Sequence, residues 1–234
     1  MTHDTKGTLD RRALLRRMAV GGAAVWATPM LHSIASAQAV PSCGPGGNGI
    51  LDWDTFGTGT AFTSTAVGTI TIGMTITNVV NTTLLTNNGR VLAGPAGGIS
   101  ENHLRFEMTP DNDGTNSGSR QTITFTFSSP VTNVEFTFFD IDTVNNSWGD
   151  RIVMNTTGYT FSTPPGSTVI GDGTNGNRFR NSNGNNNPGP TDNDGNLTIR
   201  YAGPISSFQY VYRNQGEEGG SNQLISMSDI TFSC

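Results

Sequence analysis

Apolar and polar residues alternate with a period of two in several separate segments of the chain. In 69–77, for example, Ile70 and Ile72 flank Thr71, and the alternation continues to the end of the segment. Successive side chains of a strand point to opposite faces, so this pattern is typical of an antiparallel strand with one buried face. The same period recurs at 123–127, 134–138, 197–201 and 208–212. Helical periodicity is absent after Ala39, and the sequence therefore predicts an all-β protein.

Glycine, asparagine, aspartate and proline separate these segments, for example in Asn88-Gly89 and Pro164-Pro165-Gly166. These residues supply the backbone conformations that tight turns require. About 9–11 short antiparallel strands joined by such turns fit a two-sheet sandwich of jelly-roll type. In the last strand the apolar phase changes between Met227 and Ile230, which predicts a bulge near Asp229.

The first forty residues carry a different pattern. Arg11 and Arg12 precede an apolar segment over 18–31, and small residues follow at Ala37-Gln38-Ala39. This order resembles the twin-arginine signal of bacterial exported proteins. The resemblance implies a cleaved signal peptide over 1–39, a single domain over 40–234, and a location in the periplasm, in the medium or on the cell surface. The alternative for this segment is a short amphipathic or membrane-spanning helix, but it contains Gly21, Gly22 and Pro29 and is shorter than the roughly 20 residues that span a bilayer. We also expect no membrane span in the mature chain.

The predicted mature chain is acidic. Residues 40–234 contain eight arginines and no lysine against eleven aspartates and five glutamates, a net charge of 8 − 16 = −8. The arginines are scattered along the sequence without a basic cluster. Nucleic-acid binding draws on clustered Lys and Arg, so we expect no nucleic-acid partner.

Two cysteines, Cys43 and Cys234, lie near the two ends of the mature chain. Export to an oxidising compartment favours a disulfide between them. The alternative is a lipid anchor on Cys43, although Pro41 fits a lipoprotein signal badly. With His103 as the one histidine left, ligands for zinc, iron–sulfur or haem are too few. The sequence therefore leaves only a metal site with oxygen ligands as a hypothesis.

Four segments resemble the β-sandwich modules found in many bacterial secreted and surface proteins: Leu51-Asp52-Trp53, 122–127, 130–136 and Asp140-Ile141-Asp142. The resemblance covers most of the mature chain and is a diffuse pattern of strand residues. It implies an extracellular sandwich, sometimes linked to calcium or to glycan and surface binding.

Acidic side chains follow the segment 134–138. If the strand parity continues, Asp140 and Asp142 both face the core, with Asp150 close by across a short loop. Buried charges need a partner, and Ca²⁺ takes six to eight oxygen ligands. The sequence therefore suggests a calcium site at these three residues. The alternative is that Asp140 and Asp142 cap the end of the strand by accepting backbone hydrogen bonds.

The tetrapeptide Asp-Asn-Asp-Gly occurs twice, at 111–114 and 192–195. It resembles the opening of a calcium loop, with Asp111, Asp113, Asp192 and Asp194 as the ligands, but the later glutamate of an EF-hand is missing. The alternative is that both are turns between antiparallel strands.

Candidate ligand contacts lie in two polar loops. Trp148 could stack on a sugar ring beside Asn145 and Asn146, whereas Trp53 is expected in the core. The segment 171–196 contains nine asparagines, whose amides offer donors and acceptors to sugar hydroxyls. The alternative for this segment is disorder.

These features predict an exported, non-catalytic β-sandwich module that is stabilised by calcium and binds glycan or cell-envelope material. One alternative is a structural or adhesive surface protein without a small-ligand site. A secreted glycoside hydrolase is a third hypothesis, although the spacing brings no two glutamates together across a cleft.

Overall fold

The computed structural model describes residues 47–110, 118–144, 147–182, 184–187, 189–214 and 221–234. The predicted signal peptide, Cys43, Asp111, Asp113, Asn145 and Asn146 lie outside the described residues. The described residues all belong to one compact unit. Among the described residues the only helix is a single 3₁₀ turn, η1 (Trp53–Thr55), and none is long and apolar enough to cross a membrane.

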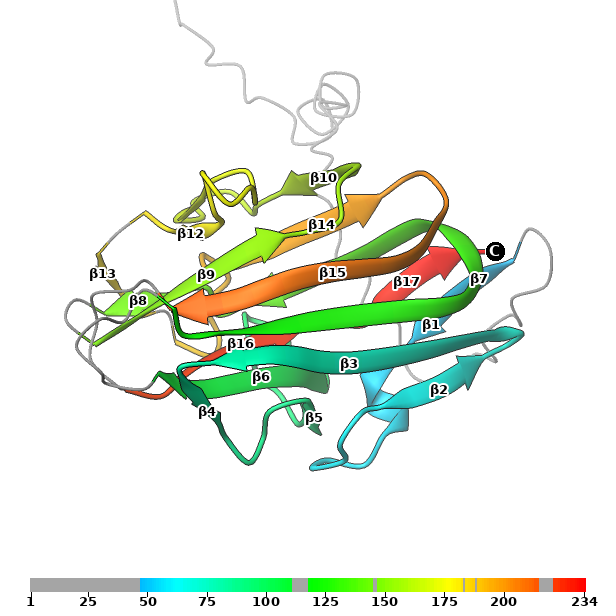
Figure 1. The fold of residues 1–234 in the computed structure, drawn as a ribbon, viewed down its shortest axis with the longest axis horizontal. Coiled ribbons are helices and arrows are strands. Elements are labelled where there is room, and N and C mark those ends of the chain that lie inside the picture. The colour runs from blue at the N-terminus through cyan, green and yellow to red at the C-terminus, as the bar shows by residue number, and fades with distance from the viewer. Residues whose placement is uncertain (1–46, 111–117, 145–146, 183, 188, 215–220) are drawn as a thin grey trace, which may run out of the picture. The chain divides into compact units, whose positions relative to one another are not determined.

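The fold is an antiparallel β-sandwich, which confirms the predicted fold class (Figure 1). The described residues contain 17 strands rather than 9–11, because several ladders are only two residues long. The first sheet has the order β2-β3-β7-β15-β9, and the short strands β8 and β13 extend it beyond β9. Its strands are β2 (Ser64–Val67), β3 (Ile70–Val80), the first part of β7 (Arg120–Phe139), β15 (Ile205–Asn214), β9 (Trp148–Met154), β8 (Thr143–Val144) and β13 (Asn185–Asn186).

The second sheet is built around the later part of β7. One edge of this part pairs with β14, which in turn pairs with β10, and the other edge pairs with β16 and β17. Beyond these, β6 pairs with β16, β4 and β5, and β1 pairs with β17. The strands are β10 (Tyr159–Ser162), β14 (Leu197–Tyr201), β16 (Gln223–Met227), β17 (Ile230–Ser233), β6 (His103–Pro110), β4 (Thr82–Leu84), β5 (Arg90–Leu92) and β1 (Asn48–Leu51). A separate ladder joins β11 (Val169–Ile170) to β12 (Arg180–Asn181).

The strand β7 belongs to both sheets. Figure 1 shows it crossing the first sheet, turning at one end of the sandwich and returning in the second sheet. The turn contains three consecutive exposed residues, Ser128, Ser129 and Pro130, and Asn133 has a positive φ of 50°. The sequence predicted two strands, at 123–127 and 134–138, and both alternations are present within this one bent strand.

Aromatic side chains from the two sheets meet in the core. The ring of Phe208 in β15 stacks on Phe136 of the second sheet, with centroids 4.6 Å apart, and on Phe125 of its own sheet at 4.9 Å. The ring of Tyr210 meets Phe138 at 4.8 Å. All of these residues are at most 1% exposed. The predicted inward positions of the alternating segments are therefore confirmed.

The last two strands show the predicted change of phase. Met227 and Ile230 are both buried, and Ser228 and Asp229 interrupt the ladder between β16 and β17. Trp53 is fully buried, and its indole nitrogen donates to the carbonyl of Ser228 at 2.7 Å. The expected core position of Trp53 is confirmed.

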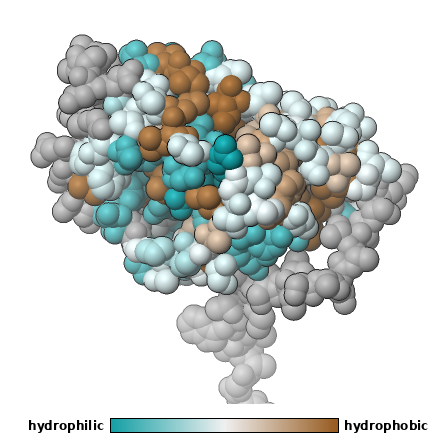
Figure 2. Space-filling model, turned by 90° about the horizontal axis from the view of Figure 1, so that it is seen from below, coloured by the Kyte–Doolittle hydropathy of each residue, from teal (hydrophilic) through white to brown (hydrophobic). Residues whose placement is uncertain are grey.

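The surface of the described residues carries few large apolar side chains. Only Val79, Phe161 and Ile170 are more than two fifths exposed. In Figure 2, which shows the sandwich from below, hydrophobic groups are interspersed with hydrophilic ones.

We expect Phe208→Ala to lower the free energy of unfolding by about 3–5 kcal/mol, because the cavity would remove ring contacts to both sheets. Urea unfolding of the purified protein measures this loss. Phe161→Ala is the matched control: its ring is 46% exposed and, among the described aromatic residues, meets only Phe179 edge-on, so it should cost at most about 1.5 kcal/mol. Equal losses in the two variants would contradict this account of the core.

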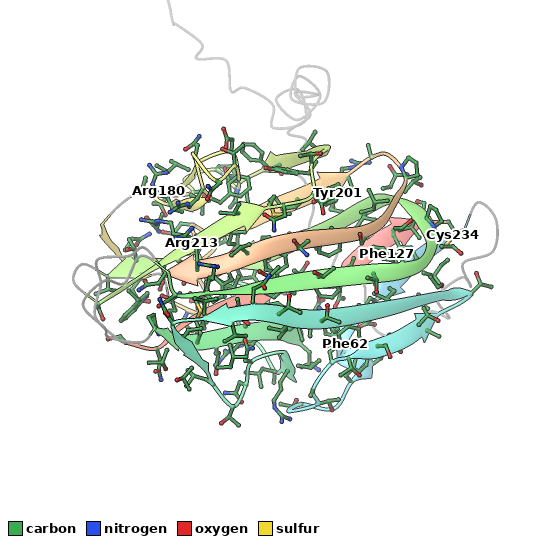
Figure 3. The ribbon with its side chains drawn as sticks, in the orientation of Figure 1. Phe62, Phe127, Arg180, Tyr201, Arg213 and Cys234 are labelled. Carbon is green, nitrogen blue, oxygen red and sulfur yellow. The ribbon has the colours of Figure 1, made fainter. Side chains whose placement is uncertain are left out.

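The C-terminal residue lies beside the start of the described chain. The backbone nitrogen of Cys234 donates to the carbonyl of Gly47 at 2.9 Å, and β17 pairs with β1. In Figure 3, Cys234 lies at the end of the sandwich where β7 turns. Cys43 is four residues before Gly47 but outside the described residues, so the Cys43–Cys234 disulfide stays a prediction.

For this disulfide we expect a cross-linked Cys43–Cys234 peptide in a non-reducing digest of the exported protein. Cys43→Ser should lower the free energy of unfolding by roughly 5 kcal/mol, less any strain, since the bond would close a loop of nearly the whole mature chain. A lipid on Cys43, or two titratable thiols in the native protein, would contradict the pairing.

Candidate functional site

Two carboxyl groups are buried at one end of the sandwich, where β8 and β9 form a hairpin. Asp142 directly precedes β8 and is 6% exposed, and Asp150 lies within β9 and is fully buried. Asp140 is half-buried in the segment that connects β7 to this hairpin. The predicted proximity of Asp142 and Asp150 is therefore observed.

Hydrogen bonds hold these two aspartates within the protein. The hydroxyl of Tyr212 donates to Oδ1 of Asp150 at 2.6 Å, and the backbone nitrogen of Asp142 donates to Oδ2 at 3.1 Å. The indole nitrogen of Trp148 donates to Oδ1 of Asp142 at 2.7 Å. The backbone nitrogen of Asp150 returns a bond to the carbonyl of Asp142 at 2.9 Å. The acids are thus closely bound to their neighbours rather than directed into water.

Burial raises the pKa values of all three aspartates. It raises the pKa of Asp150 well above its ordinary value, and the neighbouring charge of Asp142 raises it further. Burial also raises the pKa of Asp142, and it raises that of Asp140 to about 7, with Asp142 as the second cause. The raised pKa values mean that these carboxyl groups keep their protons to a higher pH than an ordinary aspartate does. A proton can therefore neutralise charge that the sequence analysis assigned to calcium.

The parity argument for Asp140 is wrong. The strand β7 ends at Phe139, and both Phe138 and Phe139 are buried. Asp140 then has a positive φ of 66°, which ends the alternation of the strand. Ile141 and Asp142 are consequently buried in succession, whereas Asp140 keeps part of its surface exposed.

The other candidate ligands are not assembled into a metal centre within the described residues. No group of three or more His, Cys, Asp or Glu side chains in that part of the chain is placed to hold a metal ion. Oδ2 of Asp192 accepts from the backbone of Gly189 at 2.9 Å, whereas Oδ2 of Asp194 accepts from the amide of Asn186 at 3.2 Å. Asp111 and Asp113 lie outside the described residues, so calcium binding stays a prediction.

The asparagine-rich segment is built into the fold. It contains β12 and β13, and Phe179 within it is fully buried and bridges to Ile152. The amide of Asn181 donates to the hydroxyl of Thr168 at 2.8 Å, and the amide of Asn196 donates to the carbonyl of Gly97 at 2.9 Å. These amides bind protein groups. Trp148 is half-buried and its nitrogen is engaged by Asp142, so its contact with a glycan stays a prediction.

A pocket of about 260 Å³ lies on the outer face of the first sheet. The strands β7, β15 and β9 and the loop after β11 contribute to it. Figure 3 shows Arg213 at this site, on β15. Two arginines, two asparagines and two valines line the pocket: Arg120, Arg213, Asn155, Asn175, Val153 and Val211.

Sequence reasoning missed this pocket because its residues are far apart along the chain. Arg120 and Arg213 are register partners across β7 and β15, and Val211 and Val153 are partners across β15 and β9. The alternation over 208–212 already assigned Val211 to the outward face. The pairing of the strands, which the sequence did not specify, brings these residues together.

No protein-family model, curated protein or solved structure matches this chain. Evidence on function therefore comes from the geometry of the two sites, the buried carboxyl group and the open pocket.

We expect the stability of the wild-type protein to fall as the pH rises from about 4 to about 7. The raised pKa values let the folded state keep protons that the unfolded chain releases above about pH 4. Their contribution is lost as the pH rises through the folded pKa, which is about 7 for Asp140. The side chain in Asp150→Asn cannot ionise. The free energy of unfolding, measured with urea, should therefore fall less steeply with pH in this variant, and the two slopes should differ by up to about 1.4 kcal/mol per pH unit.

Asp192→Asn is the matched control, because it removes an exposed carboxylate outside the buried group and should keep the wild-type slope. Asp150→Ala should cost about 1–3 kcal/mol for each group left unpaired, the hydroxyl of Tyr212 and the backbone nitrogen of Asp142. An Asp150→Asn variant with the full wild-type slope would contradict the buried proton.

The same samples test calcium at about pH 8. If an ion joins the carboxylates, a chelator should lower the wild-type melting temperature by several degrees and leave Asp150→Asn less affected. An unchanged melting temperature would contradict the calcium prediction.

Proposed function

We propose that this chain is an exported, non-catalytic β-sandwich module that binds glycan or cell-envelope material through the pocket on its first sheet. The observation that carries the proposal is the composition of the pocket lining. Guanidinium groups, amides and small apolar side chains surround one cavity on the outer face. Sugars present hydroxyl groups at their rims and apolar C–H groups on their faces, and this lining offers a partner for each.

The support of the pocket favours binding without large rearrangement. Val153 in β9 and Val211 in β15 form its floor. The strand β15 pairs with β9 on one side and with β7 on the other. The inward neighbours of Val211, Tyr210 and Tyr212, are fully buried in the core. A site on rigid strands loses less conformational entropy on binding than one on a loop.

The exposed asparagines provide the polar part of the lining. Asn155 follows β9, and its amide nitrogen donates to Oε1 of Gln209 at 2.7 Å. Asn175 lies in the loop after β11 and is exposed. An amide offers one acceptor and two donors, so each of these side chains retains hydrogen-bonding capacity toward a sugar hydroxyl.

The alternative function is a structural or adhesive surface protein without a small-ligand site. The observation in its favour is the engagement of Asn181, Asn186 and Asn196 by protein groups, which stiffens the asparagine-rich segment. The two functions differ in whether the protein binds a soluble glycan.

We expect the exported protein to bind a subset of an array of bacterial and plant glycans, and Val211→Trp to reduce those signals at least about tenfold by filling the pocket. Val79→Trp is the matched control, because Val79 is 42% exposed on β3 outside the lining, and it should keep wild-type signals. Absence of glycan binding by the wild type would favour the structural alternative. Release of new reducing ends from a bound glycan would contradict a non-catalytic module.

A further inference from the structure

Three arginine side chains lie side by side across the first sheet. Arg120 in β7 is the register partner of Arg213 in β15, and Arg213 is the partner of Arg151 in β9. Their chain neighbours Gln121 and Tyr212 are fully buried. Since neighbouring residues of a strand point to opposite faces, the arginines belong to the outer face, where the pocket lies.

A fourth arginine joins them from the loop after β11. Nε of Arg178 donates to the carbonyl of Asn175 at 3.1 Å, which ties this loop residue of the lining to the arginine. The pKa of Arg213 is lowered by burial and then by the positive charges of Arg178 and Arg120. The charges are therefore close enough to act on one another.

The gathering of positive charge contrasts with the rest of the mature chain. Arg120 and Arg213 line the pocket and the charge of Arg178 acts on Arg213, whereas the net charge of residues 40–234 is −8. The positive potential of Arg120, Arg178 and Arg213 would attract an anion to the pocket.

We infer that the pocket binds an acidic sugar unit of a glycan, with the sugar carboxylate held by Arg120 and Arg213. This inference rests on the proposed function and names the ligand class of the same site.

Different residues of the lining suit different parts of an acidic sugar. The planar guanidinium groups of Arg120 and Arg213 present paired N–H donors that match the two oxygens of a carboxylate. The floor of Val153 and Val211 accepts the apolar face of the sugar ring. The pocket of about 260 Å³ is smaller than the sites of drug-sized ligands, which favours a single sugar unit at a time.

The test is calorimetric titration of the exported protein with two oligosaccharides, an oligogalacturonate and the oligogalactose with the same linkage, at low salt. We expect the oligogalacturonate to bind at least about tenfold more tightly, and its affinity to fall as salt is raised, because screening weakens the charge attraction. Arg213→Gln and Arg120→Gln should each abolish the preference for the acidic sugar.

Arg200→Gln is the matched control. It removes the same charge from an exposed position on β14 of the second sheet, and it should keep the preference. Melting temperatures of the three variants identify any loss of binding that results from unfolding. Arg213→Lys keeps the positive charge but loses the planar, paired N–H donors of the guanidinium group, so it should retain only part of the preference for the acidic sugar.

The outcomes separate this inference from the proposed function. Equal binding of the acidic and neutral oligosaccharides would overturn the inference and leave glycan binding in place. Binding of neither, together with an empty glycan array, would overturn both. Equal affinity for poly-glutamate would show recognition of any carboxylate and overturn the assignment to sugar. A preference lost in Arg200→Gln but kept in Arg213→Gln would overturn the location.

Discussion

The passage of β7 through both sheets is the constraint on which the rest of the structure depends. Its first part pairs with β3 and β15, and its later part pairs with β14, β16 and β17. Because the chain is continuous through the turn, the two inner faces are held opposite each other. The stack of Phe136 on Phe208 then closes the core across them.

The strand β15 connects this core to both candidate sites. Its inward residues, Phe208, Tyr210 and Tyr212, fill the core, and the hydroxyl of Tyr212 ends at the buried Asp150. Its outward residues, Val211 and Arg213, line the pocket. One alternating strand thus places a polar bond inside the sandwich and a charged surface outside it, because successive side chains leave opposite faces.

Asp150 and the pocket arginines Arg120 and Arg213 illustrate two ways in which a protein accommodates charged side chains. Asp150 is fully buried, and hydrogen bonds from the hydroxyl of Tyr212 and the backbone nitrogen of Asp142 compensate for its lost solvation. Arg120 and Arg213 stay partly exposed, so water and bound anions remain accessible to them. Only the second arrangement is open to a ligand, which is why the proposed function is placed there.

Local pattern in the sequence determined the fold class, the inward aromatic positions, the core position of Trp53 and the break near Asp229, because strand periodicity and turn chemistry depend on neighbouring residues. The meeting of Asp142 with Asp150 was also predictable, since a short hairpin joins them. Tertiary structure alone decided the merging of two predicted strands into β7, the direction of Asp140 after its positive φ, and the pairing of Arg120 with Arg213. These depend on which strands become neighbours, and strand pairing is a long-range choice that periodicity leaves open.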